Sequence, residues 1–175
     1  DSAVDVAIEI LATRTPPQLQ ECLAVYKHNF QVEAVDDITS ETSGILQDLL
    51  LALAKGGRDS YSGIIDYNLA EQDVQALQRA EGPSREETWV PVFTQRNPEH
   101  LIRVFDQYQR STGQELEEAV QNRFHGDAQV ALLGLASVIK NTPLYFADKL
   151  HQALQDAVKG DCQSALLALC RAEDM

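Results

Sequence analysis

The sequence Ser40-Glu41-Thr42-Ser43-Gly44, followed by an apolar run at residues 49–53, sets the frame for the rest of the chain. A glycine with an apolar run five to nine residues later returns at Gly126 and again at Gly160. Upstream, Thr-Arg-Thr-Pro at residues 13–16 returns as Gln-Arg-Asn-Pro at residues 95–98. Both motifs share one offset, because 126 − 44 and 96 − 14 each equal 82. This repeat offset predicts a repeated supersecondary unit.

These repeated residues resemble the annexin family. Ile-Leu-Ala-Thr-Arg-Thr-Pro at residues 10–16 is similar to the family's I-L-x-x-R-(S/T) segment. Residues 40–44 resemble its (D/E)-T-S-G loop, and Lys159-Gly160-Asp161 falls in the same loop of a last repeat. The resemblance covers nearly the whole chain, and it is closest to members with degenerate calcium loops. It implies annexin-type helical repeats of about five helices each, in a right-handed superhelix.

Apolar residues recur at helical spacing through the chain, and no longer stretch alternates with period two, so the sequence predicts an all-α fold. Ser43 is the expected N-cap of the helix at 45–54, and Pro91 is expected to kink the helix at 85–95. Residues 58–67 form a connector. The predicted helices span residues 4–13, 16–30, 32–39, 45–54, 71–80, 85–95, 98–112, 115–123, 127–140 and 143–154.

The repeat frame predicts three units, at residues 1–66, 67–140 and 141–175. The first is expected to lack its first helix. In the last, the spacing falls to 160 − 126 = 34, so that unit is expected to lack its second, third and fourth helices and to have a calcium-type loop before its closing helix. By resemblance, these units correspond to repeats two, three and part of four of an annexin. Missing helices expose apolar faces, which predicts a more oligomeric or less soluble chain.

Composition bounds the partners. The 175 residues are 44% hydrophobic and 23% charged, typical of a globular protein. The net charge is −13, from 14 basic and 27 acidic residues, which disfavours nucleic acid and leaves membrane binding in need of a bridging cation, a basic patch or an apolar insertion. Three widely spaced cysteines, Cys22, Cys162 and Cys170, predict free thiols in a reducing compartment. No signal peptide is expected, and the cytoplasm is the expected location.

The resemblance implies calcium sites built from a Gly-x-Gly-Thr loop and a carboxylate about 39 residues later, a ligand set that suits Ca²⁺. In the first unit, 2 + 39 places Glu41 at the carboxylate position, but Asp1-Ser2 replaces the glycine and threonine. In the second, Gly82-Pro83-Ser84 replaces the loop and 84 + 39 places Arg123 at the carboxylate position. In the last, Ala157 takes that position. Calcium binding is therefore expected to be weak or lost.

Each candidate residue also has a structural interpretation. We interpret Glu41 as a helix-cap or surface acid in preference to a vestigial calcium ligand. We interpret Arg123 as a solvated side chain in preference to a contact for a lipid phosphate. Arg14 and Arg96 are expected to pair inside the bundle, and Trp89 to lie in the core. The histidines share no metal-ligand spacing and are expected at the surface; they are His28, His100, His125 and His151.

Two functions remain open. The first is a peripheral protein that binds anionic phospholipid, such as phosphatidylserine, with weak or no calcium dependence, and the positive charge of Arg123, His125 and Lys159 favours it. The second is a non-enzymatic partner-binding, adhesion or receptor-type module, acting as a homo-oligomer or at the cell surface, and the net charge favours it. No catalytic constellation is found, so an enzyme is not expected. The predicted lipid contacts are Ser40, Thr42, Ser43, Gly44, Gly82, Ser84, Arg123 and Gly126.

Overall fold

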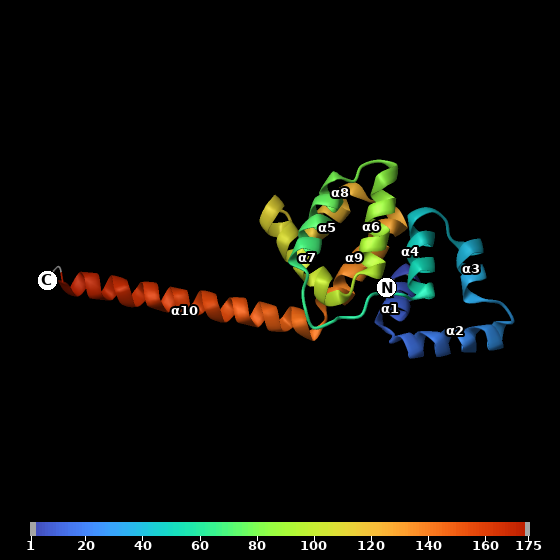
Figure 1. Cartoon of the computed structure of the whole chain (residues 1–175), viewed down its shortest axis with the longest axis horizontal. Helices are drawn as coiled ribbons and strands as arrows, with labels where there is room; N and C mark the ends of the chain where they lie inside the picture. Colours follow the sequence, from blue (N-terminus) through green and yellow to red (C-terminus); the bar gives the residue numbers. More distant parts are fainter. Residues whose placement is uncertain (1–2, 174–175) are drawn as a thin grey trace. The chain divides into compact units, whose positions relative to one another are not determined.

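The computed structural model describes the backbone of residues 3–173 and the side chains of residues 3–147, 149–151 and 153–160. The described backbone is helical and contains no strand, which confirms the all-α prediction (Figure 1). The chain divides into two compact units, residues 1–140 and residues 141–175. The helices are α1 (Ala3–Thr13), α2 (Pro16–Phe30), α3 (Ala34–Glu41), α4 (Gly44–Lys55), α5 (Tyr67–Arg79), α6 (Pro83–Gln95), α7 (Pro98–Thr112), α8 (Leu116–Arg123), α9 (Gly126–Lys140) and α10 (Pro143–Glu173).

The repeat offset holds for the helix boundaries themselves. α2 and α7 begin and end at this offset, since 98 − 16 and 112 − 30 both equal 82, and the same is true of α3 and α8. α4 and α9 begin at the same offset, and α1 and α6 end at it. We call α1–α4 the first helix set and α6–α9 the second helix set. The predicted repeat is confirmed, while the proposed division into three repeats, at 66/67 and 140/141, stays a prediction.

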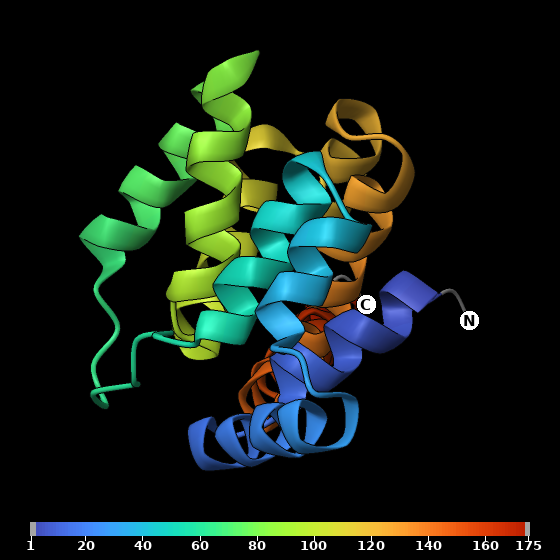
Figure 2. The same cartoon turned by 90° about the vertical axis from the view of Figure 1, so that its right-hand side faces the viewer.

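The core of the larger unit is built from the two apolar helices that follow the repeated glycines. α4 and α9 pack against α1 and against each other, and α4 also packs on α6 (Figure 2). Trp89 is fully buried between Phe93, whose ring centroid is 5.8 Å away, and the edge of Phe124 at 5.2 Å. The prediction that Trp89 belongs to the core is confirmed.

Several helix ends differ from their predicted positions for local reasons. α3 starts at Ala34, later than predicted, because Gln31 takes the left-handed conformation (φ 57°) that ends α2. α5 starts at Tyr67, earlier than predicted, because the Asp66 side chain accepts the Leu69 N–H at 3.0 Å and caps the helix. α6 continues through Pro91. Ser43 is the N-cap of α4 as predicted, but its side chain makes no capping hydrogen bond.

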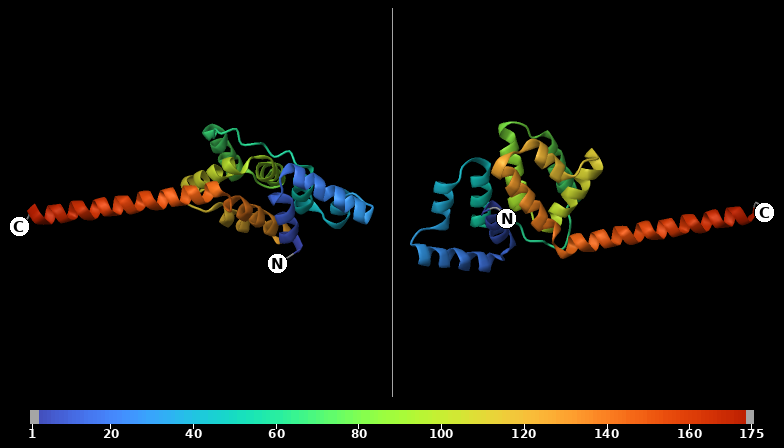
Figure 3. Two further views of the ribbon diagram at one scale, coloured as in Figure 1. Left: turned by 90° about the horizontal axis from the view of Figure 1, so that it is seen from below. Right: turned by 180° about the vertical axis from the view of Figure 1, so that it is seen from behind.

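The second unit contains one uninterrupted helix where a loop was predicted. α10 runs through Lys159-Gly160-Asp161 (Figure 3), so the predicted calcium-type loop is wrong and Lys159 is a helical residue. Gly44 follows Thr42-Ser43, which favour a helix start, whereas Gly160 follows Val158-Lys159. A lone glycine costs a helix only about 1 kcal/mol and does not end it.

No single helix in the described part of the chain is long and apolar enough to cross a membrane. Taken together, α9 and residues 143–160 have the length and apolar composition of a span, but they are two helices separated by a break.

Candidate functional site

The predicted contact loops lie at one end of the larger unit. The α3–α4 loop and the α5–α6 loop both lie at the upper end of the unit as drawn in Figure 1. The α8–α9 loop lies against the α5–α6 region, because the Arg85 Nη1 donates to the Arg123 carbonyl at 2.5 Å. The α3–α4, α5–α6 and α8–α9 loops therefore lie at this end, which we call the loop end. In the sequence, the predicted contacts lie in or beside these loops: Ser40, Thr42, Ser43, Gly44, Gly82, Ser84, Arg123 and Gly126.

A glutamine clamps the same loop in both helix sets. The Gln47 Nε2 donates to the carbonyls of Thr39, at 2.9 Å, and Thr42, at 2.6 Å. The Gln129 Nε2 donates to the carbonyls of Gln121, at 3.1 Å, and Phe124, at 2.9 Å. The glutamine and both of its carbonyl partners are shifted by the repeat offset of 82 residues from the first set to the second. The glutamine fixes the loop, and the glycine after the loop, Gly44 or Gly126, takes φ of +63°. Sequence reasoning identified the glycines but not the glutamines, although the repeat offset contains them.

The acid of the first set has no direct polar contact. Glu41 is exposed at the end of α3, and its carboxylate makes no hydrogen bond or ion pair with the described residues. Neighbouring polar side chains are used locally: the Ser40 Oγ donates to the Asp37 carbonyl, and the Thr42 Oγ1 donates to the Ile38 carbonyl. The rest of the predicted calcium loop, Asp1-Ser2, lies outside the described residues. The role of Glu41 as a vestigial calcium ligand therefore stays a prediction.

The cation of the second set has a fixed place. The Arg123 Nη1 donates to the Leu77 carbonyl at 2.6 Å and the Nη2 to the Gln78 carbonyl at 3.2 Å. The guanidinium also lies over the Trp89 ring, 5.9 Å from its centroid. The interpretation of Arg123 as solvated is therefore wrong. The last-turn carbonyls of α5 attract the guanidinium because they lack donors within the helix and carry negative partial charge.

A second guanidinium lies beside the first. Arg85 donates to the Arg123 carbonyl and lies over the Phe124 ring, 5.7 Å from its centroid. Phe124 in turn packs edge-on against Trp89. Neither arginine is within ion-pair distance of a described carboxylate. The loop end of the second set therefore has two positive charges, and among the described residues their contacts are with carbonyl oxygens and ring faces. The chain as a whole is strongly acidic.

The loop between α5 and α6 is closed by its own serine. The Ser84 Oγ donates to the Glu81 carbonyl at 2.8 Å and accepts the Glu81 N–H at 3.1 Å. Gly82 supplies the left-handed turn, with φ of +56°. A calcium loop needs inward carbonyls and a nearby carboxylate. This loop uses one carbonyl internally, and Arg123 takes the position at which the family's carboxylate is expected.

A buried charged network lies beneath the connector between the helix sets. The Asp73 carboxylate accepts hydrogen bonds from the Arg96 Nε, at 2.9 Å, and Nη2, at 3.1 Å. It also forms a hydrogen bond with the His100 Nε2, at 2.7 Å. Burial pushes the pKa of Asp73 upward, but the hydrogen bonds from His100 and Arg96 outweigh it and leave the pKa lowered. The hydrogen bond to Asp73 raises the pKa of Arg96.

The network corrects one expectation and confirms part of another. His100 is buried, so the prediction that every histidine lies at the surface is wrong. Arg96 pairs inside the bundle as predicted. Arg14 is exposed, and among the described residues its hydrogen bond is to the Thr13 Oγ1, at 3.3 Å. Arg14 has no counterpart of Asp73 among residues 1–175, because the repeat offset of 82 would place that counterpart before residue 1. Asp73 itself was missed, because a single acid on an amphipathic helix resembles a solvated side chain.

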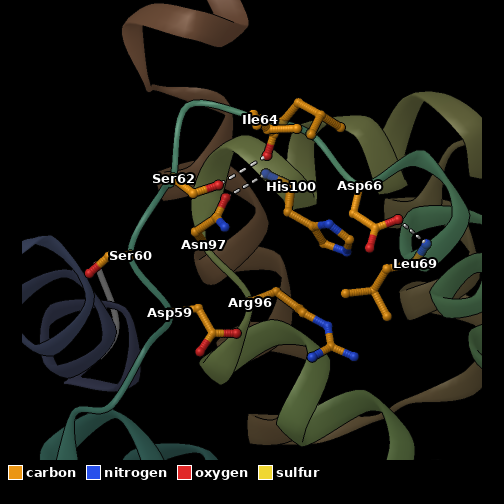
Figure 4. Close-up of a pocket in the computed structure, with 10 residues that line it drawn as sticks. Asp59, Ser60, Ser62, Ile64, Asp66, Leu69, Arg96, Asn97 and His100 are labelled. Atoms are coloured by element: carbon orange, nitrogen blue, oxygen red, sulfur yellow. Dashed lines mark hydrogen bonds between the residues drawn. The ribbon is translucent and has the colours of Figure 1, made fainter.

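A pocket of about 340 Å³ opens above this network (Figure 4). Arg96 and His100 reach it but are bound to Asp73, while Asp66 is engaged in capping α5. It contains no pairing of a nucleophile with a base. Its lining residues are Asp59, Ser60, Ser62, Ile64, Ile65, Asp66, Leu69, Arg96, Asn97 and His100. Among the described side chains, no cluster of three or more His, Cys, Asp or Glu residues could hold a metal ion.

The repeated helices and loops define an all-α helical-repeat protein. A family model described as Annexin matches residues 2–53 and 72–135, well over half of the chain. The chain therefore belongs to the annexin family.

Curated relatives and solved structures agree with this assignment. Annexin A9 of Bos taurus is 79% identical over 150 residues, which are 86% of this chain and 44% of that protein. Annexin A9 of Mus musculus is 71% identical, with the same coverage of 86% and 44%. A mutant of annexin A8 with an intact N-terminus has a TM-score of 0.73 at 33% identity, covering 87% of this chain and 48% of that chain. Chicken annexin V in complex with Zn²⁺ has a TM-score of 0.72 at 37% identity, covering 87% and 49%. The chain spans less than half the length of these relatives.

Proposed function

We propose that this chain is a non-enzymatic peripheral protein that binds anionic phospholipid, phosphatidylserine in particular, through its loop end. In the second helix set, the binding does not require calcium. Membership of the annexin family supports phospholipid binding, and the same membership supports a cytosolic location with reversible attachment to membranes. The proposed contacts are the exposed loop residues together with Arg123.

The position of Arg123 carries the calcium part of the proposal. A bound Ca²⁺ would bring positive charge to the loop end and be held by carbonyls and a carboxylate. Arg123 brings a positive charge to the same place without a metal, and two α5 carbonyls hold it there. Its guanidinium has five N–H donors, of which two are used, so donors remain for a lipid phosphate. A Ca²⁺ ion at this position would be repelled by Arg123 and by the neighbouring Arg85.

The first helix set supports a residual, weak calcium effect. Glu41 supplies an exposed carboxylate at the position equivalent to Arg123. One carboxylate with few other ligands gives low affinity, because Ca²⁺ requires roughly six to eight oxygens. We therefore expect calcium at millimolar concentration to add little to binding.

Co-sedimentation with phosphatidylserine vesicles tests the proposal, in millimolar calcium and in chelator, at two salt concentrations. We expect pelleting in chelator that falls as salt rises, because exposed charge interactions are screened. Arg123→Lys keeps the charge and should retain pelleting, whereas Arg123→Gln should reduce it. Glu41→Gln is the matched control in the other helix set, and it should leave pelleting in chelator unchanged.

Two results would contradict the proposal. Pelleting only with calcium, abolished by Glu41→Gln, would show a working calcium site in the first set. An absence of pelleting under all conditions would remove lipid binding and leave the partner-binding module as the better account. Phosphatidylcholine vesicles in parallel separate a requirement for anionic lipid from general adsorption.

A further inference from the structure

Two arginines and two aromatic rings of the second helix set form one cluster, which we call the arginine cluster. Arg85 and Trp89 lie four residues apart on α6, so their side chains are neighbours on one face of the helix. The Arg123 guanidinium lies over the Trp89 ring, and the Arg85 guanidinium lies over the Phe124 ring. The centroids of the two rings are 5.2 Å apart. Both cations therefore lie against one aromatic pair.

The first helix set has none of these residues. The equivalent positions, 82 residues earlier, hold two small residues, an acid and a hydroxyl: Ala3, Ala7, Glu41 and Thr42. The glutamine clamp of the loop is nevertheless the same in both sets. The arginine cluster is therefore an addition to a scaffold that forms without it, which points to a role other than holding the scaffold together.

The arginine cluster has more hydrogen-bond donors than acceptors. Arg123 uses its two Nη atoms on α5 carbonyls, and Arg85 uses its Nη1 on the Arg123 carbonyl. The Arg85 Nε and the Trp89 Nε1 are enclosed and have no acceptor among the described residues. No described carboxylate is within ion-pair distance of either guanidinium. Because buried donors and charges are normally satisfied, this excess favours an anion from outside the chain.

We propose that the arginine cluster is a binding site for a phosphate monoester group, with Arg85 as a second cationic contact beside Arg123. A phosphate monoester carries about −1.5 to −2 charges at neutral pH and has three strong acceptor oxygens. Two guanidiniums match that charge, and their planar arrangement of donors suits phosphate oxygens. The assignment of this group to a lipid headgroup rests on the proposed function.

The same charges favour phosphatidate, a monoester lipid, over the diester lipids. In phosphatidylglycerol and phosphatidylserine the phosphate carries a single charge, and phosphatidylserine also has an ammonium group that the two guanidiniums would repel. Phosphatidylserine then binds chiefly through Arg123. At equal vesicle surface charge, we expect phosphatidate to bind about fivefold more tightly than phosphatidylglycerol, the effect of one further basic contact near a membrane.

Co-sedimentation in chelator tests this preference. The vesicles are phosphatidylcholine with either phosphatidate or phosphatidylglycerol, matched in zeta potential. Arg85→Gln should reduce the preference for phosphatidate to less than about twofold, because it leaves one cation in the cluster. Arg85→Lys keeps the charge and should retain at least about half of the preference. Arg14→Gln is the matched control, since it removes an exposed positive charge outside the cluster, and it should leave the preference unchanged.

Soluble phosphates distinguish a lipid headgroup from a free phosphate compound. Glycerol 3-phosphate is a monoester and dimethyl phosphate is a diester. Trp89 fluorescence can report their binding, because Trp89 is the single tryptophan and lies against Arg123. We expect glycerol 3-phosphate to change the fluorescence at roughly millimolar concentration, as a small ligand with few contacts does. Dimethyl phosphate should have a smaller effect, and Arg123→Gln should remove the response.

Equal pelleting with the two kinds of vesicle would overturn the proposal, as would a preference that survives Arg85→Gln. If Arg85→Gln also lowers the midpoint of urea unfolding, the lysine variant decides between charge and fold. A preference lost from a stable Arg85→Lys chain would show that the charge of Arg85 is not what selects the lipid, and would also overturn the proposal.

The proposed function can fail separately from this site. Pelleting on phosphatidylserine in chelator that depends on Arg123, without a preference for phosphatidate, would keep the proposed function and overturn the monoester site. An absence of pelleting on every kind of vesicle, with a fluorescence response to glycerol 3-phosphate that Arg85→Gln weakens, would do the reverse. It would overturn the lipid assignment and support a site for a soluble phosphate compound.

Discussion

Positions 41 and 123 occupy the last turn of equivalent helices, α3 and α8. Glu41 makes no hydrogen bond with the described residues, whereas the Arg123 guanidinium is bound to two carbonyls. Around them the backbone is the same, with the same clamping glutamine and the same glycine conformation. Positions 14 and 96 differ in a similar way, since Arg14 is exposed and Arg96 is bound to Asp73. The two sets therefore share a scaffold, while their charges can be varied independently of it. Paired substitutions at equivalent positions of the two sets test that separation.

The largest difference is expected between Arg96→Ala and Arg14→Ala. Removing Arg96 leaves Asp73 buried with one partner, and breaking a buried ion pair costs about 3 kcal/mol in the free energy of unfolding. Arg14→Ala should change it by less than about 0.5 kcal/mol, as surface substitutions do. Urea unfolding followed by Trp89 fluorescence measures both, because this chain has a single tryptophan and it lies in the core. Equal losses would show that Arg14 has a buried role in solution.

Acid should weaken the same network through Asp73. The pKa of Asp73 is lowered in the folded state, so its contribution to stability is present above its unfolded pKa and is lost as pH falls through its folded pKa. Asp73→Asn should cost about 2 kcal/mol at neutral pH. That cost should shrink as the pH is lowered, because protonated Asp73 approaches Asn in charge. A cost independent of pH in urea unfolding would mean that packing, rather than charge, accounts for it.

A smaller difference is expected between Arg123→Gln and Glu41→Gln. Arg123→Gln removes the donors to the Leu77 and Gln78 carbonyls and the contact with the Trp89 ring. Two partly exposed hydrogen bonds of this kind are worth about 1.5 kcal/mol together. Glu41→Gln removes no hydrogen bond and should be nearly neutral. Hydrogen exchange at the end of α5 should increase only in the Arg123 variant, and an increase in neither would mean that the arginine is not held there in solution.

The sequence predicted the scaffold better than the charges. Helical spacing and the repeat offset are properties of many positions, so α2, α7 and the repeated glycines could be predicted from the pattern. The partners of Arg123 and His100 could not, because each depends on one contact between distant segments: Arg123 reaches α5, and His100 reaches Asp73. The loop predicted at Gly160 failed for a related reason. Glycine permits a turn, but the capping residues before it decide whether the helix starts there.

That last point can be measured at the three repeated glycines. Gly44 and Gly126 have φ of +63°, and a Cβ at either would meet nothing within 4 Å, so Gly→Ala there tests backbone conformation alone. Left-handed backbone costs a non-glycine residue about 1 kcal/mol, and both variants should lose that amount in urea unfolding. Gly160 lies inside α10 with equally open surroundings, so Gly160→Ala should instead stabilise the helix by about 0.5–1 kcal/mol. Hydrogen exchange at the α10 amides on either side of Gly160 measures this gain. The same substitution should thus have opposite signs in the two units, and a loss at Gly160 would restore the turn that the repeat pattern first suggested.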